Sequence, residues 1–197
     1  FCRAGACLTP PANDTRASAT LIDTSRPASI LSANTTNARN EGASSTCGCT
    51  SGNDVFYRFV LTVPEIVYAD TVGAAWDTGL FFQSSTVTTI TASGLTNGLA
   101  CNDDGGLSGC NLPRLGASQV MVRLNAGTYY LVLSGCGAGA ASVRFHHLPV
   151  GNGAVTALPA GSGQSLSGTT SGTGQVVGCT GSGPENTYWW RTCNTAR

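Results

Sequence analysis

Short segments rich in β-branched and aromatic residues recur along this 197-residue chain, with turns of Gly, Asn and Ser between them. Such side chains fit the pleated surface of a sheet, and these turn residues make the tight connections that short strands need. Helical periodicity is weak, and its best candidate is a short turn over residues 14–19. The pattern predicts an all-β fold, an antiparallel β-sandwich, with strands at 55–63, 66–68, 80–83, 87–92, 119–124, 128–134 and 141–148.

The charge of the chain argues against two classes of partner. Only 10% of the residues are charged, the formal net charge is zero, and the chain contains no Lys. Nucleic acids and anionic membrane surfaces attract proteins through clustered positive charge, which is absent from this sequence. No apolar run reaches the roughly 18 residues that a membrane helix needs. We therefore expect a soluble protein with no nucleic-acid partner and no membrane insertion.

The nine cysteines indicate an oxidising compartment. A zinc site is disfavoured because Cys47 and Cys49 are closer than the usual spacing of zinc ligands, and the only histidines are the adjacent His146 and His147. The chain begins without Met or an apolar leader, and its last residue, Arg197, is the residue that a trypsin-like protease or an artificial boundary leaves. These features predict a secreted protein that is processed at both ends.

Two disulfides are predicted from cysteines close in sequence. Cys101 and Cys110 bracket a short loop, and a bond between them closes it with little rearrangement of strands. Cys2 and Cys7 form a second candidate pair in the N-terminal segment.

The other five cysteines leave the connectivity open. Cys47, Cys49 and Cys136 are expected to share one bridge across the sandwich, and Cys179 and Cys193 lie near the C-terminus. Because nine is odd, at least one thiol is free, joined to another chain or waiting for a partner. We expect Cys193 to be that thiol.

An internal repeat gives the chain its organisation. Its first copy comprises residues 29–36, 49–54 and 56–58. The same three blocks return in the same order at residues 164–170, 178–185 and 188–191, with Cys179 matching Cys49. Strands rich in Ser, Thr and Gly resemble each other by chance, but the conserved order of three blocks favours a repeat. The second copy stops at residues 193–197, before any counterpart of Asp77, of the 101–110 loop or of the 127–130 strand.

The blocks resemble the bacterial pre-peptidase C-terminal domain. The resemblance rests on five ordered pieces, residues 11–20, 53–59, 76–78, 101–104 and 124–133. It divides the chain into an N-terminal segment (1–12), a complete domain (13–149) and the first part of a second (150–197). It implies a jelly-roll-like β-sandwich that accompanies enzymes or surface proteins without catalysing a reaction, and some members of the family bind calcium or matrix polymers.

Four residues are candidate calcium ligands. Asp77, Asn102, Asp103 and Asp104 are the densest group of the oxygen donors that calcium prefers. Asp and Asn followed by Gly105-Gly106 also suit a tight turn that caps its own backbone, and their spacing is not that of an EF-hand. Calcium is the one cofactor for which the sequence offers ligands, and the turn interpretation stays open beside it.

Catalysis is not expected. The adjacent His146 and His147 point to opposite faces of a strand, and the chain has neither a Gly-x-Ser-x-Gly elbow nor a convincing carboxylate pair. The aromatic run Tyr188, Trp189 and Trp190 suits a sugar-stacking platform, but its place in the repeat favours a core or a partner interface.

Two functions follow as hypotheses. In the first, the chain is a non-catalytic structural protein whose incomplete second sandwich is completed by another chain or by a precursor fragment, in an extracellular fibre or surface complex. In the second, it is an accessory module that attaches a secreted hydrolase to a matrix, a polysaccharide or a cell surface.

Overall fold

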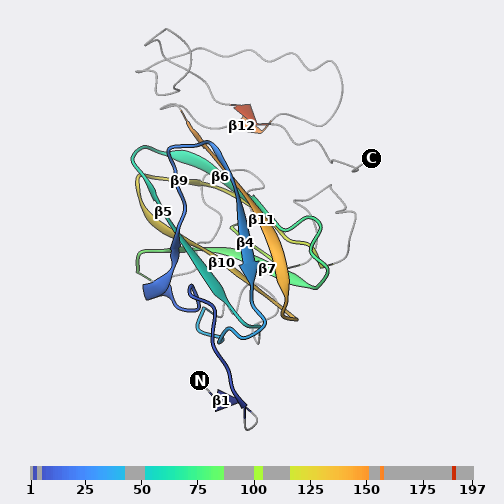
Figure 1. Cartoon of the computed structure of the whole chain (residues 1–197). Helices are drawn as coiled ribbons and strands as arrows, with labels where there is room; N and C mark the ends of the chain where they lie inside the picture. The colour runs from blue at the N-terminus through green and yellow to red at the C-terminus, as the bar shows by residue number, and fades with distance from the viewer. Residues whose placement is uncertain are drawn as a thin grey trace, which may run out of the picture.

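Two β-sheets packed face to face make up most of the described chain (Figure 1). The computed structural model describes residues 7–42, 52–86, 100–103 and 116–150 in full. It also describes the backbone of four short segments, Cys2–Arg3, Ala6–Cys7, Thr156–Ala157 and Tyr188–Trp189. The strand predicted at 87–92 lies outside these residues.

The first sheet has five strands. Their order is β3 (Thr20–Leu21), β5 (Val55–Leu61), β10 (Gly127–Gly135), β7 (Thr78–Ser84) and β8 (Cys101–Asn102). Strand β10 lies at the centre and pairs antiparallel with both β5 and β7. Strand β3 is the exception, because it runs parallel to β5.

The second sheet has four antiparallel strands. Their order is β4 (Ala28–Asn34), β11 (Ala140–Pro149), β6 (Glu65–Asp70) and β9 (Gln119–Leu124). Strand β11 shows the cause of the layering, since its buried residues alternate with exposed ones and face the first sheet. The two layers confirm the predicted all-β sandwich, and a short 3-10 helix, η1 (Arg16–Ser18), takes the place of the predicted turn at 14–19.

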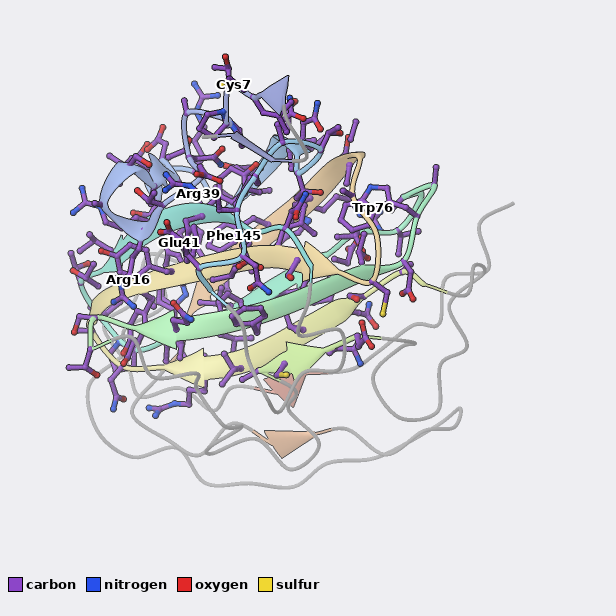
Figure 2. All side chains as sticks on the ribbon, turned by 90° about the horizontal axis from the view of Figure 1, so that it is seen from below. Cys7, Arg16, Arg39, Glu41, Trp76 and Phe145 are labelled. Carbon is purple, nitrogen blue, oxygen red and sulfur yellow. The ribbon has the colours of Figure 1, made fainter. Side chains whose placement is uncertain are left out.

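The core lies between the sheets, and Phe59 is at its centre. The Phe59 ring lies 5.1 Å from the Phe145 ring and about as close to the rings of Phe82 and Tyr129. Figure 2 shows Phe145 between the layers, with Arg16 and Trp76 at opposite ends of the sandwich. A smaller cluster of Phe56, Phe81 and Val132 covers the outer face of the first sheet.

Two short strand pairs lie apart from these sheets. Strands β1 (Cys2–Arg3) and β2 (Ala6–Cys7) pair antiparallel, with Cys2 opposite Cys7. Strands β12 (Thr156–Ala157) and β13 (Tyr188–Trp189) pair in parallel. Strands β1 and β12 lie beyond opposite ends of the sandwich (Figure 1). The division of the chain at residues 12 and 149 stays a prediction.

Candidate functional site

One end of the sandwich gathers most of the residues that the sequence singles out. We call it the Asp77 end, and it is the end at which β7 and β9 begin and β6 and β10 finish. Asp77 precedes β7, whereas Asn102 lies within β8 and Asp103 follows it. Asn102 therefore lies in a short strand where the sequence predicted a loop. Asp104 lies outside the described residues.

Two carboxylate groups lie close to the main chain at the Asp77 end. Asp77 Oδ1 lies 3.3 Å from the position that a Cβ atom would take on Gly116. Asp103 Oδ1 lies 3.7 Å from the position that a Cβ atom would take on Gly79. Both oxygens are buried. The fold thus brings two of the predicted ligands to the start of β7.

A network of buried hydroxyl groups fixes this end. The Thr71 and Thr78 hydroxyl oxygens are 2.6 Å apart, and Thr78 Oγ1 donates to the Gly116 carbonyl at 2.8 Å. The Ser118 N–H donates to Thr71 Oγ1 at 2.9 Å, and the single proton of the Ser118 hydroxyl lies within reach of the carbonyl oxygens of both Thr78 and Asp103. Because these bonds join both sheets to the turn before β9, they set the position of the Asp103 main chain.

The Asn102 side chain binds a backbone donor of another strand and not the backbone of its own turn. Its Oδ1 accepts the Gln119 N–H at 3.1 Å, which ties β8 to the start of β9. An amide oxygen in this geometry satisfies a backbone donor at the start of a strand. Of the predicted calcium ligands, the structure thus gives a hydrogen-bond partner of Asn102 and the positions of the Asp77 and Asp103 carboxylates.

Trp76 lies against a glycine turn at the same end. Its indole N–H donates to the Ala140 carbonyl at 3.0 Å. A Cβ atom on Gly135 or Gly139 would come within 2.7 or 2.8 Å of the indole ring, closer than real Cβ atoms approach. The glycines of the β10–β11 turn therefore let the ring lie against the backbone. The sequence analysis did not identify this contact, although glycines alternate at 135, 137 and 139.

A second polar cluster lies near the start of β5. The Asp14 carboxylate accepts bonds from the Arg39 side-chain Nε–H at 2.7 Å and from the Arg39 backbone N–H at 2.6 Å. Asp54 Oδ2 accepts the Gly42 N–H at 2.6 Å. Asp14 is 2% exposed and Asp54 is fully buried. Burial, the largest cause, raises the pKa of Asp54, and the nearby Asp14 charge acts in the same direction.

The Asp54 pKa gives a prediction for stability against pH. A raised pKa in the folded state means that the stability this group contributes is present below the unfolded pKa and is lost as the pH rises through the folded pKa. We expect Asp54→Asn, which removes the buried charge, to be more favourable for Tm at pH 7 than at pH 4 and to give a net gain of at most a few degrees, because the amide keeps only one oxygen to accept the Gly42 N–H. The gain should shrink as the pH falls to about 4, and thermal melts at several pH values measure it.

Asp23→Asn is the matched control. Asp23 is exposed, and its pKa is lowered because the Ser25 hydroxyl donates a hydrogen bond to it. Its contribution therefore has the opposite sign and is screened by solvent. If the Tm gain of Asp54→Asn were the same at pH 4 and pH 7, burial of the Asp54 charge would not be its cause.

The two histidines differ as expected for neighbours on a strand. His146 is exposed, while His147 is buried and lies between Glu65 and the β3–β4 loop. His147 Nδ1 is 2.5 Å from Glu65 Oε2, and its Nε2 is 2.7 Å from the Arg26 carbonyl oxygen. In the part of the chain that the structure describes, no three His, Cys, Asp or Glu side chains are grouped to hold a metal ion.

Three cysteines in the described residues, Cys7, Cys101 and Cys136, are disulfide-bonded. Cys2 is opposite Cys7 in the β1–β2 ladder, which is the arrangement that the predicted pair needs. The pairings themselves stay predictions. Several predicted site residues lie outside the described residues, namely Cys47, Cys49, Cys110, Cys179, Cys193 and Trp190; Tyr188 and Trp189 are described by their backbone alone.

Within the described ranges, no helix has the length and apolar character to cross a membrane. No protein-family model matches the chain, and no curated protein matches it. Among solved structures, the fold is similar to the pre-peptidase C-terminal domain of collagenase from Bacillus anthracis, at 10% sequence identity and a TM-score of 0.37. The match covers 66% of this chain and 93% of that one. This solved domain is of the family that the sequence motifs resemble.

Proposed function

We propose that this chain is a secreted, non-catalytic structural protein, in which one complete β-sandwich is followed by the opening strands of a second. One observation carries the proposal. Strand β3 pairs in parallel with β5, with Thr20 opposite Tyr57, and β12 pairs in parallel with β13, with Thr156 opposite Tyr188. The other seven ladders of the described residues are antiparallel.

The two parallel pairs involve matching parts of the repeat. Strand β13 belongs to the block at 188–191, which corresponds to the block at 56–58 in β5. In both copies a short strand that precedes the Ser/Thr-rich block pairs with the aromatic strand that follows it. When Trp189 is aligned with Phe56, β12 contacts β13 two residues nearer the start of the aromatic strand than β3 contacts β5. A shift of two residues keeps the same side chains on the same face of the sheet. The shared pairing direction supports the repeat.

In this proposal the second copy, within residues 150–197, repeats the sequence blocks of the first copy up to the aromatic strand. No segment of it resembles the Asp77 turn, the 101–110 loop or the Gly127–Gly135 strand. The opening strands of a sandwich expose unpaired backbone groups and an apolar face, which further polypeptide must cover. Continuation of the same precursor or another chain meets this need, and a head-to-tail contact between identical chains builds a filament.

The oligomeric state of the full chain tests the proposal. We expect light scattering after size exclusion to show a complex or concentration-dependent multimers, and non-reducing electrophoresis to show whether disulfides join chains. Replacing Tyr188 and Trp189 together by serine should shift the protein toward monomer. Ile30→Ser, at an exposed position of β4, is the control and should not. A clean monomer at all concentrations, with every thiol accounted for inside the chain, would contradict the assembly role and favour the accessory binding module.

Calcium binding at the Asp77 end is a second proposal, supported by the buried carboxylate oxygens of Asp77 and Asp103 at the start of β7. We expect a chelator to lower Tm and excess calcium to restore it. Saturation at 100 times the dissociation constant stabilises a protein by about 2.7 kcal/mol. Asp103→Asn should abolish the response, and the exposed Asp23→Asn should not. Equal melting curves with and without calcium would contradict calcium binding, and only the turn interpretation would remain.

A further inference from the structure

The outer face of the second sheet presents polar side chains that the proposed function does not use. Along strand β11, buried residues alternate with exposed ones, and the exposed Arg144 and His146 point away from the first sheet. Residues directly opposite one another on neighbouring strands share a face of the sheet. Two rows of side chains therefore cross the outer face, Ile30, Arg144, Asp70 and Gln119 in one and Ala28, His146, Tyr68 and Met121 in the other.

A buried carboxylate holds two of these side chains in place. Asp70 is 1% exposed, and its oxygens accept the Arg144 Nε–H at 2.8 Å and the Tyr68 hydroxyl at 2.7 Å. The Val72 N–H donates to the same carboxylate at 3.0 Å, and the Gln119 side-chain amide donates to the Tyr68 oxygen at 2.5 Å. Because Arg144 and Tyr68 are already fixed by Asp70, a ligand that binds them loses less entropy in ordering them.

Arg144 keeps its two terminal amino groups for a ligand. Its side chain is 45% exposed, and its bonds to Asp70 involve Nε alone. Among the described residues, Nη1 and Nη2 have no hydrogen-bond acceptor. Arg123 adds a second positive charge to the face, and Asp70 is the one acid among the outward residues of these four strands, all of which the structure describes. The face is therefore net positive, and the planar guanidinium group suits two parallel hydrogen bonds to a carboxylate.

The place of this face in the sheet favours a carbohydrate over a peptide. Strands β11 and β6 are interior strands, paired on both sides, so their outer face offers a ligand side chains alone. Peptides that bind a sheet do so through main-chain bonds at its edge. A sugar needs no main-chain partner, because its hydroxyl groups bond to polar side chains and its CH groups pack on aromatic or aliphatic ones. The Tyr68 and His146 rings, 5.9 Å apart, and Ile30, 75% exposed, supply that surface.

We infer that the outer face of the second sheet, around Arg144, is a binding site for an acidic polysaccharide. The Arg144 Nη1 and Nη2 groups bind the carboxylate of a uronic acid unit, and the sugar ring lies over Tyr68 and His146. Asp70 is a positioning residue, since it acts on the ligand through Arg144 and Tyr68. All of these residues belong to the complete sandwich. The site therefore goes beyond the proposed function and does not depend on whether the chain assembles.

Arg144→Lys tests the inference, with polygalacturonate as the probe. A lysine keeps the positive charge beside Asp70, but its ammonium group has no planar fork for a second carboxylate. We expect the affinity of the full chain for polygalacturonate to fall about 10-fold or more. Calorimetric titration measures it at about 0.15 M salt, where attraction between distant charges is largely screened. Thermal melts show whether the variant keeps its fold.

Arg58→Lys is the matched control. Arg58 is exposed on β5, in the first sheet, so the same exchange there should leave the affinity unchanged. Methyl-esterified polygalacturonate has the same backbone without free carboxylates, and we expect it to bind about 10-fold more weakly or worse. The inference is overturned if polygalacturonate does not bind, if Arg144→Lys binds it as tightly as the unmodified chain, or if the ester binds equally well. Polyglutamate that binds as tightly as polygalacturonate also overturns it, because the face would then be a site for an acidic peptide.

Discussion

Phe59→Ala is expected to lower the free energy of unfolding by about 3–5 kcal/mol, the range for removing a buried phenylalanine. Phe59 is fully buried on β5 and contacts aromatic rings from three other strands, since Phe82 is on β7, Tyr129 on β10 and Phe145 on β11. Its removal leaves a cavity between the two sheets that neighbouring rings fill only in part. Equilibrium unfolding in urea measures the loss from the midpoint, at an unchanged slope.

Val60→Ala is the control on the same strand. Its side chain points away from the core and is 40% exposed, so its truncation should change stability by about 0.5 kcal/mol or less. A loss below about 1 kcal/mol for Phe59→Ala would mean that the core around Phe145 collapses to fill the space, contrary to the close packing described here.

Most of the longer strands were predicted from their β-branched and aromatic residues, but β4 (Ala28–Asn34) was not among the predicted strands. The predicted strand at 119–124 has the bounds of β9, and the predicted strands at 128–134 and 141–148 each differ from β10 and β11 by one residue at either end. Strand β11 alternates buried and exposed residues, whereas β9 and β10 are recognisable in the sequence as apolar runs rich in β-branched and aromatic residues. The two-residue strands β3 and β8 were not predicted, since two residues carry no periodicity and their pairing depends on the neighbouring strand.

The candidate site was predictable where its residues share a chemistry, as a group of oxygen donors does. The 101–104 segment and Asp77 appeared as a group of oxygen donors, and the fold brings Asp77 and Asp103 to one end of the sandwich. Sequence reasoning missed the contacts of Asp14 with Arg39, 25 positions apart, and of Glu65 with His147, 82 positions apart. Spacing along the chain cannot reveal such pairs, because the order of strands in the sheets decides them.

The buried pair of Glu65 and His147 gives the second large prediction. Their side chains are 7% and 6% exposed, and the pair joins the start of β6 to the end of β11. The Arg26 carbonyl only accepts hydrogen bonds, so His147 Nε2 donates to it, while Nδ1 faces the Glu65 carboxyl group. His147→Leu leaves the Glu65 carboxyl group buried without its partner, and we expect this substitution to lower the free energy of unfolding by about 3–5 kcal/mol.

The double variant Glu65→Leu with His147→Leu separates the two causes of that loss. Replacing both partners of a buried pair by apolar groups is often neutral, because no charge is left without its partner. The double variant should therefore recover most of the stability lost in His147→Leu, less about 1–3 kcal/mol for the Arg26 carbonyl that has lost its donor. Urea unfolding of the wild type, both single variants and the double variant gives the coupling energy directly. If the two single losses simply added, the residues would contribute by packing alone, and the short contact between Nδ1 and Oε2 would carry no net interaction.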